Sequence, residues 1–428
     1  MGKSIIETLR RVTEPAYFKF FLIPRARMKQ TRCIREIRKE GKAKIVFIVS
    51  SLPMWRLQSL FNQLQDDVHF DVSIAIYPFN NWPCEQKARA MEELRDYFSQ
   101  QGIQILDLSQ KTFPGKSLRE MKNPDLIFYP QPYNHLFWND LDNQYFEDKL
   151  VCYIPYGMPV VRLPWIDKTL LHNTAWRVFL HSESRKQQAQ SVLFNHGRNI
   201  RVTGEPISDL FKLPAKNQVW KKQEQQKKRV IWAPHYSILS DDLLHQNSFL
   251  WLSDSMLKIA ENYKDQIQFS FKPHPRLFLT LCELPDWGRK RAEAYYKAWR
   301  EGENTQLDIG YYIDLFKDAD AMIHDSSSFT AEFHYTKKPV LFTTKNADEV
   351  INTLNEFGKE ALSAHYFADS EEKIVDFIEK TVLGGDDPKK PERESFYQKY
   401  LLPPNGQSVA ENIYDEILSG LGWRKRKD

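Results

Sequence analysis

Residues 43–50 have the sequence AKIVFIVS. A continuous apolar, β-branched run of this kind is typical of a strand buried on both faces of a parallel sheet, because a strand with one wet face alternates apolar and polar residues. Further strand-like runs follow, most of them separated by segments of helical composition, at residues 70–77, 103–108, 125–129, 151–155, 177–181 and 199–203. This alternation predicts a doubly wound α/β domain.

A second series of strand-like runs starts at residues 229–234, RVIWAP, and continues at 266–272, 319–324 and 339–342. Between the two series, residues 212–228 are rich in Lys and Gln and lack apolar periodicity, which predicts an exposed linker or helix. A chain of 428 residues is also longer than one hydrophobic core usually organises. We therefore predict two Rossmann-like α/β domains, at residues 43–211 and 229–390.

Both ends of the chain are basic. The first 44 residues carry thirteen Lys or Arg and four Glu, an excess of nine positive charges in a chain whose net charge is +4. Residues 1–42 are interpreted as a leader that docks on an anionic membrane surface, with a solvated leader as the alternative. Residues 391–428 are expected to form a helix that packs back on the first domain, followed by a basic tail at 424–427.

Several classes of protein are disfavoured. No window approaches the roughly 20 apolar residues of a membrane span, and no secretory signal is recognised, so we expect a cytoplasmic protein. Neither a zinc site nor a disulfide framework fits the wide spacing of Cys33, Cys84, Cys152 and Cys282. We expect no metal site, because the two Asp-x-Asp pairs, Asp140 with Asp142 and Asp318 with Asp320, do not follow predicted strands. No recognised module indicates nucleic-acid binding.

Polar residues follow three predicted strands of the second domain. The carboxyl ends of parallel strands in an open sheet form the usual ligand-binding edge, so these residues define a candidate site. They are His235 after residues 229–234, the group Lys272, His274 and Arg276 in KPHPR, and the run Asp325, Ser326, Ser327 and Ser328.

The serine run precedes a predicted helix start, where free backbone N–H groups can bind phosphate; simple capping of the helix by Asp325 or a serine explains the pattern equally well. Glu332 lies one helical turn after Ser328, within reach of a ribose hydroxyl, or else it is a solvated glutamate. Two prolines hold His274 in a stiff turn, which suits a hydrogen-bond donor or an acid–base group, although a structural histidine remains the alternative.

In the first domain, the stretch 153–159 (YIPYGMP) ends a predicted buried strand with a glycine turn. This pattern indicates a candidate loop for the acceptor substrate, with Tyr156 at its centre. A buried strand followed by a turn accounts for the pattern equally well.

The three second-domain segments, together with residues 202–206 (VTGEP) around Gly204, resemble the CDP-glycerol glycerophosphotransferase family of teichoic-acid and capsule polyol-phosphate transferases. The resemblance covers about residues 152–342. The family's K-P-H-P motif corresponds to residues 272–275, and its D-x-S-S turn with a later acidic residue corresponds to Asp325, Ser327, Ser328 and Glu332. The resemblance implies two domains of the glycosyltransferase-B type facing a cleft, with the donor held by the second domain.

The resemblance also implies the reaction. Glycerol phosphate, or a related polyol phosphate, would pass from CDP-glycerol to a cell-envelope glycan or lipid-linked acceptor at the inner face of the plasma membrane, releasing CMP without a cofactor. His274 and the Ser327–Ser328 turn would hold the pyrophosphate. Where the family carries a His-Gly pair whose His is regarded as the base, this chain has Tyr156, and an unperturbed tyrosine with a pKa near ~10 is a poor base. Residues 233–237 of this chain (APHYS) correspond to the family's motif A-P-T-x-R, so His235 occupies the position of the Thr and the Arg is missing.

Two other functions compete with this one. A sugar-nucleotide-dependent glycosyltransferase of capsule or lipopolysaccharide synthesis would use the serine turn and Glu332 for a nucleotide sugar. A non-catalytic, membrane-peripheral scaffold of envelope assembly would agree with Tyr156 in place of the family's histidine.

Overall fold

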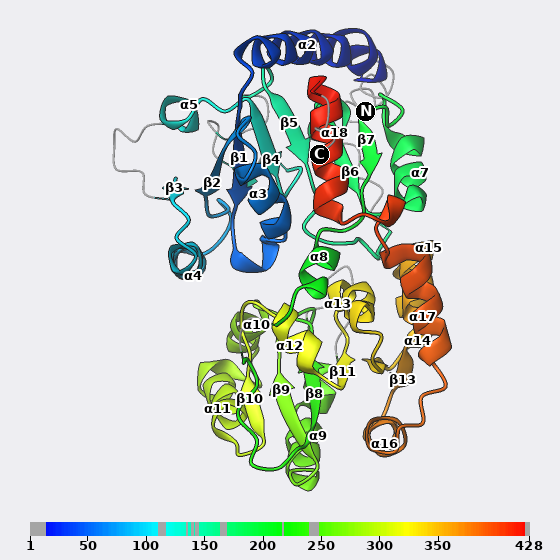
Figure 1. Cartoon of the computed structure of the whole chain (residues 1–428). Helices are drawn as coiled ribbons and strands as arrows, with labels where there is room; N and C mark the ends of the chain where they lie inside the picture. The colour runs from blue at the N-terminus through cyan, green and yellow to red at the C-terminus, as the bar shows by residue number, and fades with distance from the viewer. Residues whose placement is uncertain are drawn as a thin grey trace, which may run out of the picture. The chain divides into compact units, whose positions relative to one another are not determined.

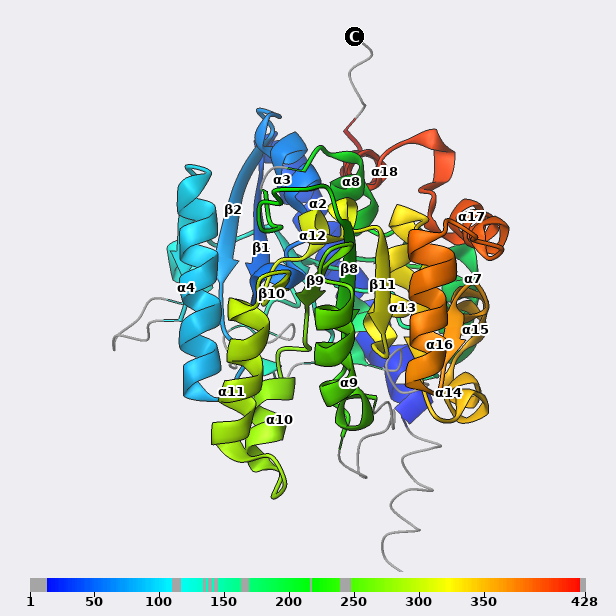
Figure 2. The ribbon, with the colours of Figure 1, turned by 90° about the horizontal axis from the view of Figure 1, so that it is seen from below.

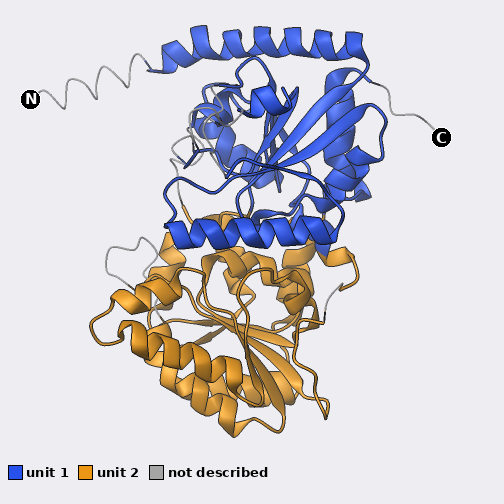
Figure 3. Ribbon diagram, turned by 90° about the vertical axis from the view of Figure 1, so that its left-hand side faces the viewer, with its two compact units in different colours: residues 1–156, 163–210, 403–428 blue, residues 157–162, 211–402 orange. Residues whose placement is uncertain are grey.

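The computed structural model describes residues 14–109, 117–133, 136–137, 141, 145–162, 169–215, 218–238 and 248–423. The chain forms two compact units, traced in Figure 1 and coloured separately in Figure 3. Unit 1 consists of residues 1–156, 163–210 and 403–428, and unit 2 consists of residues 157–162 and 211–402. The basic residues at 3–11 and 424–427 lie outside the described residues.

Unit 1 is built on a seven-stranded parallel sheet of order β3-β2-β1-β4-β5-β6-β7. Phe47 of β1 belongs to the core on one face, whereas Val46 and Ile48 belong to the core on the other face. Burial of both faces explains why residues 43–50 carry no polar alternation. The strands are β1 (Ala43–Val49), β2 (Phe70–Ile76), β3 (Ile105–Asp107), β4 (Leu126–Tyr129), β5 (Leu150–Tyr153), β6 (Arg177–Leu180) and β7 (Ile200–Val202).

Helices connect the strands of unit 1 and cover its sheet. The helix α8 continues past residue 210 into unit 2. The helical elements are η1 (Phe18–Leu22), α2 (Ile23–Glu40), η2 (Leu52–Met54), α3 (Gln58–Gln65), α4 (Cys84–Gln100), α5 (Leu118–Met121), α6 (Leu170–Thr174), α7 (Glu183–Val192), α8 (Ile207–Lys212), η8 (Pro404–Gly406) and α18 (Val409–Leu421).

Unit 2 has a six-stranded parallel sheet of order β10-β9-β8-β11-β12-β13. The two edge strands were missed in the sequence because each has only three residues, which is shorter than the apolar runs that indicate a strand. The fold class is nevertheless confirmed, since both units are parallel α/β sheets. The strands are β8 (Lys228–Ala233), β9 (Ile267–Phe271), β10 (Thr305–Leu307), β11 (Ala321–His324), β12 (Val340–Thr343) and β13 (Tyr366–Ala368).

The core of unit 2 is rich in aromatic rings. The ring of Trp232 on β8 lies 5.7 Å from Phe249 of α9, 5.0 Å from Phe271 of β9 and 5.5 Å from Trp299 of α11. Figure 2 shows α9, α10 and α11 on the same side of these strands. The helical elements are α9 (Phe249–Asn262), α10 (Leu277–Glu283), α11 (Gly288–Glu301), α12 (Ile313–Asp318), α13 (Ser327–Glu332), η5 (Phe333–Thr336), α14 (Ala347–Thr353), α15 (Glu356–Ser363), α16 (Glu371–Asp376), η6 (Phe377–Leu383), α17 (Lys390–Phe396) and η7 (Tyr397–Leu401).

The C-terminal segment is shared between the two units. Residues 391–402, expected on the first domain, belong to unit 2, and only residues from 403 onward return to unit 1. There α18 buries Ile413 and Ile417 completely in the core beneath β1. The buried carboxylate of Asp209 accepts hydrogen bonds from the first two backbone N–H groups of this helix, at 3.0 and 2.8 Å. Asp209 therefore caps a helix 200 residues away in sequence.

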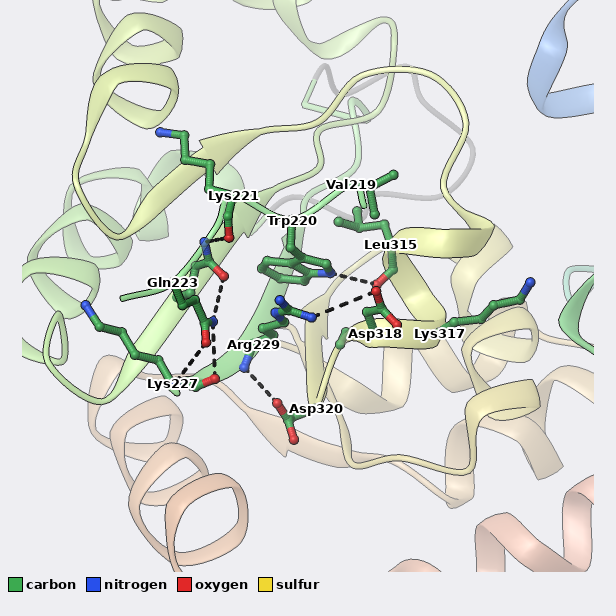
Figure 4. Close-up of polar contacts among 12 residues, drawn as sticks. Val219, Trp220, Lys221, Gln223, Lys227, Arg229, Leu315, Lys317, Asp318 and Asp320 are labelled. Atoms are coloured by element: carbon green, nitrogen blue, oxygen red, sulfur yellow. Dashed lines mark hydrogen bonds and ion pairs between the residues drawn. The ribbon is translucent and has the colours of Figure 1, made fainter. Parts of the chain in front are cut away.

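Most described residues of the predicted linker or helix, 212–228, are exposed, but part of it contacts unit 2 (Figure 4). Trp220 is 2% exposed, and its Nε1 donates to the carbonyl of Leu315 at 3.2 Å. The Gln223 side chain accepts from the backbone N–H of Lys227 at 2.9 Å and donates to its carbonyl at 3.3 Å. Polar side chains thus supply hydrogen-bond partners for the backbone groups of this irregular segment. Such contacts leave no apolar periodicity in the sequence.

The part of the basic leader that the structure describes is helical. Helix α2 buries Ile23, Ala26, Cys33 and Ile37 against unit 1 and ends at Gly41, whose φ of 69° is left-handed. Among the described residues, no helix has the length and apolar character needed to cross a bilayer. The described part of the leader therefore forms a surface helix with one buried face.

We expect Asp209→Ala to destabilise unit 1, because two buried N–H groups at the start of α18 would lose their acceptor. Loss of a helix cap lowers stability by about 1–2 kcal/mol, which corresponds to a decrease in melting temperature of roughly 2–4 °C per kcal/mol. Thermal unfolding followed by circular dichroism measures this change. Asp254→Ala, which removes a carboxylate that is 74% exposed, should melt like the wild type. A wild-type melting temperature for Asp209→Ala would refute the capping role.

Candidate functional site

The loops that follow β9, β8 and β11 meet at the carboxyl edge of the unit 2 sheet, where these three strands are neighbours. The His274 N–H donates to the Pro234 carbonyl at 3.0 Å, which joins the loops after β9 and β8. The His235 N–H donates to Asp325 Oδ1 at 2.5 Å, which joins the loops after β8 and β11. The rings of His235 and His274 lie 4.9 Å apart. The structure thus brings together the three segments that the sequence singled out.

Asp325 holds these loops in place. Its side chain is 1% exposed, and Oδ2 accepts from the N–H of Ser248 at 2.9 Å and from its hydroxyl at 2.6 Å. Burial raises the pKa of Asp325 to about 6, although the hydrogen bonds oppose this shift. Both carboxylate oxygens have internal partners, so we assign Asp325 to the framework of the site and not to direct donor binding, which is where the sequence had placed it.

The two histidines of the site are neutral and have defined tautomers. His235 Nδ1 lies 2.6 Å from Ser237 Oγ and accepts from the Ser237 N–H at 3.3 Å. His274 Nδ1 accepts from the Arg276 N–H at 3.1 Å. A neutral imidazole that accepts at Nδ1 carries its proton on Nε2. Each ring therefore offers one Nε2–H donor.

Burial is the main reason for this neutrality. It lowers the pKa of His235 to about 4, with a smaller effect of the Arg276 charge. The pKa of His274 is held well below its usual value by burial first, and then by His235, Arg276 and Lys272. Because an adjacent negative charge favours the imidazolium form, a bound phosphate would raise both pKa values.

Two basic side chains border the histidines in different ways. The guanidinium of Arg276 is exposed and lies 4.3 Å above the Tyr236 ring, which is 4.4 Å from the His274 ring. Lys272 is buried, and its Nζ donates to the Gly310 carbonyl at 3.0 Å. Arg276 is thus placed to meet an anion, whereas Lys272 has an internal partner and braces the loop after β10.

The serine turn opens α13, with Ser326 buried, Ser327 half-buried and Ser328 exposed. Glu332, at the end of this helix, is 1% exposed and accepts from the Tyr312 hydroxyl at 2.5 Å. The solvated alternative for Glu332 is therefore wrong. A contact with a ribose stays a prediction.

Tyr156 and Gly204 belong to unit 1. Tyr156 is 40% exposed and lines a cavity of about 20 Å³, room for roughly one water molecule, beside the ends of β1, β4 and β5. Gly204 has a φ of +93°, and a Cβ there would lie 2.8 Å from the side chain of Val409. Gly204 is thus required for packing of the C-terminal segment. A contact with the donor stays a prediction.

Sequence reasoning missed several residues that shape the site. Ser248, Ser237 and Tyr312 supply the partners of Asp325, His235 and Glu332. Tyr312 follows the edge strand β10, which the sequence does not signal, and Ser248 lies at the start of α9 without a local pattern.

Metal chemistry finds no support in the described part of the chain, where no group of three or more His, Cys, Asp or Glu could hold an ion. Asp318 and Asp320 instead engage Arg229 (Figure 4), through an ion pair at 3.8 Å and a backbone hydrogen bond at 2.8 Å. The other pair, Asp140 and Asp142, lies outside the described residues.

Comparisons with known proteins support the fold. No family model matches the chain, and no curated protein sequence does. Among solved structures, UDP-GlcNAc 2-epimerase from Neisseria meningitidis bound to UDP-GlcNAc is 15% identical, with a TM-score of 0.57 over 88% of this chain and 100% of that one. The S. aureus MnaA-UDP co-structure is 14% identical, with a TM-score of 0.56 over 90% and 99%.

A variant of the wall teichoic acid polymerase TagF is 11% identical, with a TM-score of 0.61 over 99% of this chain and 98% of that one. At such identities the likeness shows the fold alone, which is the two-domain α/β fold of the glycosyltransferase-B type.

We expect the stability of the protein to fall as the pH drops below about 6.5, the pKa of an unfolded histidine. Burial lowers the folded-state pKa of six histidines, so the unfolded state binds more protons and is favoured in acid. Each such imidazole destabilises the fold by about 1.4 kcal/mol per pH unit below 6.5. The six are His181, His235, His274, His324, His334 and His365.

Asp325 acts in the opposite direction, because its raised pKa favours the folded state as the pH falls below about 6. One carboxyl does not offset six imidazoles. Urea unfolding between pH 8 and pH 4.5 measures the balance, and a stability that stays constant from pH 7.5 to pH 5.5 would contradict it.

Proposed function

We propose that this protein is a transferase that moves a polyol phosphate from a CDP-activated donor to an acceptor of the cell envelope and releases CMP. One observation carries the proposal: two neutral imidazoles, His235 and His274, follow adjacent strands with their protons on Nε2, beside the exposed guanidinium of Arg276. Such donors suit a pyrophosphate, whose oxygens accept hydrogen bonds and carry negative charge.

The proposed reaction is a phosphoryl transfer. An acceptor hydroxyl attacks the phosphorus that bears the polyol, a new O–P bond forms, and the P–O bond of the pyrophosphate breaks so that CMP leaves. Negative charge grows on the CMP phosphate as that bond breaks, and the Nε2–H groups stabilise it by hydrogen bonding. The proton of the hydroxyl leaves to solvent or to a base other than Tyr156, since a tyrosine is a poor proton acceptor at neutral pH.

The donor class is supported by the motif resemblance to CDP-glycerol glycerophosphotransferases and by the fold likeness to the polymerase TagF. The likeness to structures of UDP-GlcNAc 2-epimerases favours a second candidate, an enzyme that uses a nucleotide sugar. In both cases the nucleotide would lie at the carboxyl edge of the unit 2 sheet, with Glu332 as the expected ribose partner. The scaffold alternative predicts donor binding without turnover.

We expect CDP-glycerol and CMP to raise the melting temperature of the protein, since a ligand that binds only the folded state stabilises it. A thermal-shift panel with CDP-glycerol, CDP-ribitol, CMP and UDP-GlcNAc measures the selectivity. Stabilisation by UDP-GlcNAc alone would move the assignment to a nucleotide-sugar enzyme. Absence of any shift would remove the proposed donor site.

The expected contacts are tested by Arg276→Gln and His274→Gln, each of which should weaken CDP-glycerol binding roughly tenfold, the loss typical of a charge-assisted hydrogen bond. Arg289→Gln is a matched control, because Arg289 also lies over an aromatic ring, 5.8 Å from Phe278 on α10. Equal affinities for Arg276→Gln and Arg289→Gln would exclude Arg276 from the site.

We also propose that the N-terminal helix docks the enzyme on the anionic inner surface of the plasma membrane. Phe20 and Phe21 are each 65% exposed, and Met28 is 68% exposed. Basic residues surround these apolar side chains, and each one near an anionic bilayer contributes about 1 kcal/mol of attraction. Aromatic side chains beside cations are typical of helices that lie in a membrane interface.

Glu147 reduces this charge, since it pairs with Arg25 and Lys29. Most of the other basic side chains of α2 remain available, so we expect binding to vesicles that contain phosphatidylserine and its loss at high salt. The double substitution Phe20→Ser and Phe21→Ser should abolish co-sedimentation with these vesicles. The control is Val68→Ser, which changes a residue elsewhere in unit 1 that is 77% exposed and should leave vesicle binding unchanged. Equal vesicle binding of the two variants would contradict the docking surface.

A further inference from the structure

Three histidines of unit 2 form a buried group behind the serine turn. His324 ends β11, His334 lies in η5 and His365 directly precedes β13, and each is at most 1% exposed. The Nε2 atoms of His324 and His365 are 3.1 Å apart, and the rings of His334 and His365 are 4.8 Å apart. Burial keeps all three imidazoles neutral at physiological pH.

The carbonyl of Ala361 fixes the proton positions in this group. It lies in the last turn of α15, where it also accepts from the backbone N–H of Ala364 at 3.3 Å. His365 Nδ1 is 2.9 Å from this oxygen and His334 Nε2 is 3.0 Å from it. At this distance the ring nitrogen is favoured as an N–H donor, because its lone pair would otherwise face the lone pairs of the oxygen. His365 is therefore protonated at Nδ1, which leaves its Nε2 as an acceptor.

The next proton position follows from this one. Because His365 Nε2 accepts, the facing Nε2 of His324 must carry a proton, and His324 Nδ1 is then an acceptor. That atom lies 3.1 Å from both the N–H and the carbonyl oxygen of Ser326. As an acceptor, His324 Nδ1 forms its hydrogen bond with the Ser326 N–H and not with the Ser326 oxygen. The hydrogen bonds therefore run in one direction, from Ser326 N–H to His324, from His324 to His365, and from His365 to Ala361.

Helix α15, which carries the Ala361 carbonyl, is fixed at its first turn. Asn355 caps the first turn, with Oδ1 accepting from the Gly358 N–H at 2.8 Å. The same side chain donates to the Pro159 carbonyl at 2.8 Å, and the Asn355 N–H donates to the Val160 carbonyl at 2.9 Å. Helix α15 is thus tied to residues 157–162, so the Ala361 carbonyl cannot shift freely when the site changes.

We propose that His365 is a positioning residue that acts through His324 to hold the Ser326 N–H, and with it the Ser326–Ser328 turn, in the conformation that receives the donor phosphates. Without the acceptor at His365, the proton of His324 is free to move to Nδ1, where it would donate to the Ser326 carbonyl oxygen, and the Ser326 N–H would then lose its acceptor. The effect on affinity rests on the proposed function, whereas the effect on the turn does not.

The first test compares His365→Leu, which removes the acceptor, with His365→Gln, whose Oε1 can accept from His324 Nε2. Hydrogen–deuterium exchange of residues 325–332 should be roughly five- to tenfold faster in His365→Leu, as expected for the loss of one hydrogen bond. In His365→Gln it should stay within about twofold of the wild type. Nitrogen NMR of labelled histidines should show His324 protonated at Nε2 in the wild type.

The matched control is His334→Leu, which removes a second imidazole bonded to the same carbonyl but leaves the path from Ser326 to His365 intact. Equal exchange rates in His365→Leu and His334→Leu, or His324 protonated at Nδ1 in the wild type, would overturn the proposal.

Affinity for CDP provides the second test. Binding by calorimetry should weaken by roughly the same five- to tenfold in His365→Leu and recover in His365→Gln. If wild-type protein binds no CDP, the proposed function fails while the exchange data still decide the role of His365. If CDP binds the wild type, His365→Leu and His365→Gln with equal affinity, His365 does not position the turn for the ligand and the proposal is wrong.

Discussion

The carboxylate of Asp325 is the constraint on which the candidate site depends. It lies at the end of β11 with 1% of its surface exposed, and it accepts from the backbone of His235 and from Ser248. A buried carboxylate is tolerated only when its oxygens are satisfied, so the loop after β8 and the start of α9 must converge on it. This convergence sets the distance between His235 and His274, and hence the spacing of the two N–H donors available to an anion.

The same principle organises the rest of unit 2 and the return of the chain to unit 1. Polar groups that cannot reach solvent determine where remote segments lie: Gln223 pairs with the backbone at Lys227, and Asp209 caps α18. The imidazoles behind the serine turn are ordered in this way as well, because each neutral ring has one donor and one acceptor to place. Apolar packing builds the two sheets, whereas these polar contacts fix the loops that carry the chemistry.

The sequence predicted the sheets because burial on both faces leaves a direct signal, an unbroken apolar run such as residues 43–50. It also predicted the three strand ends of the site, since polar residues after such runs stand out. Partners decided by tertiary contact, such as Ser248 and Tyr312, leave no local pattern. For the same reason the burial of Trp220, the placement of residues 391–402 on unit 2 and the internal role of Asp325 could not be predicted.

The account is tested most directly by a crystal structure of the protein in complex with CDP-glycerol. It predicts that phosphoryl oxygens lie within hydrogen-bond distance of Nε2 of both His235 and His274, while the Asp325 carboxylate keeps its contacts with the His235 N–H and Ser248. A donor bound away from the loops that follow β8, β9 and β11, or a site in which Asp325 turns to contact the ligand, would contradict the central claim.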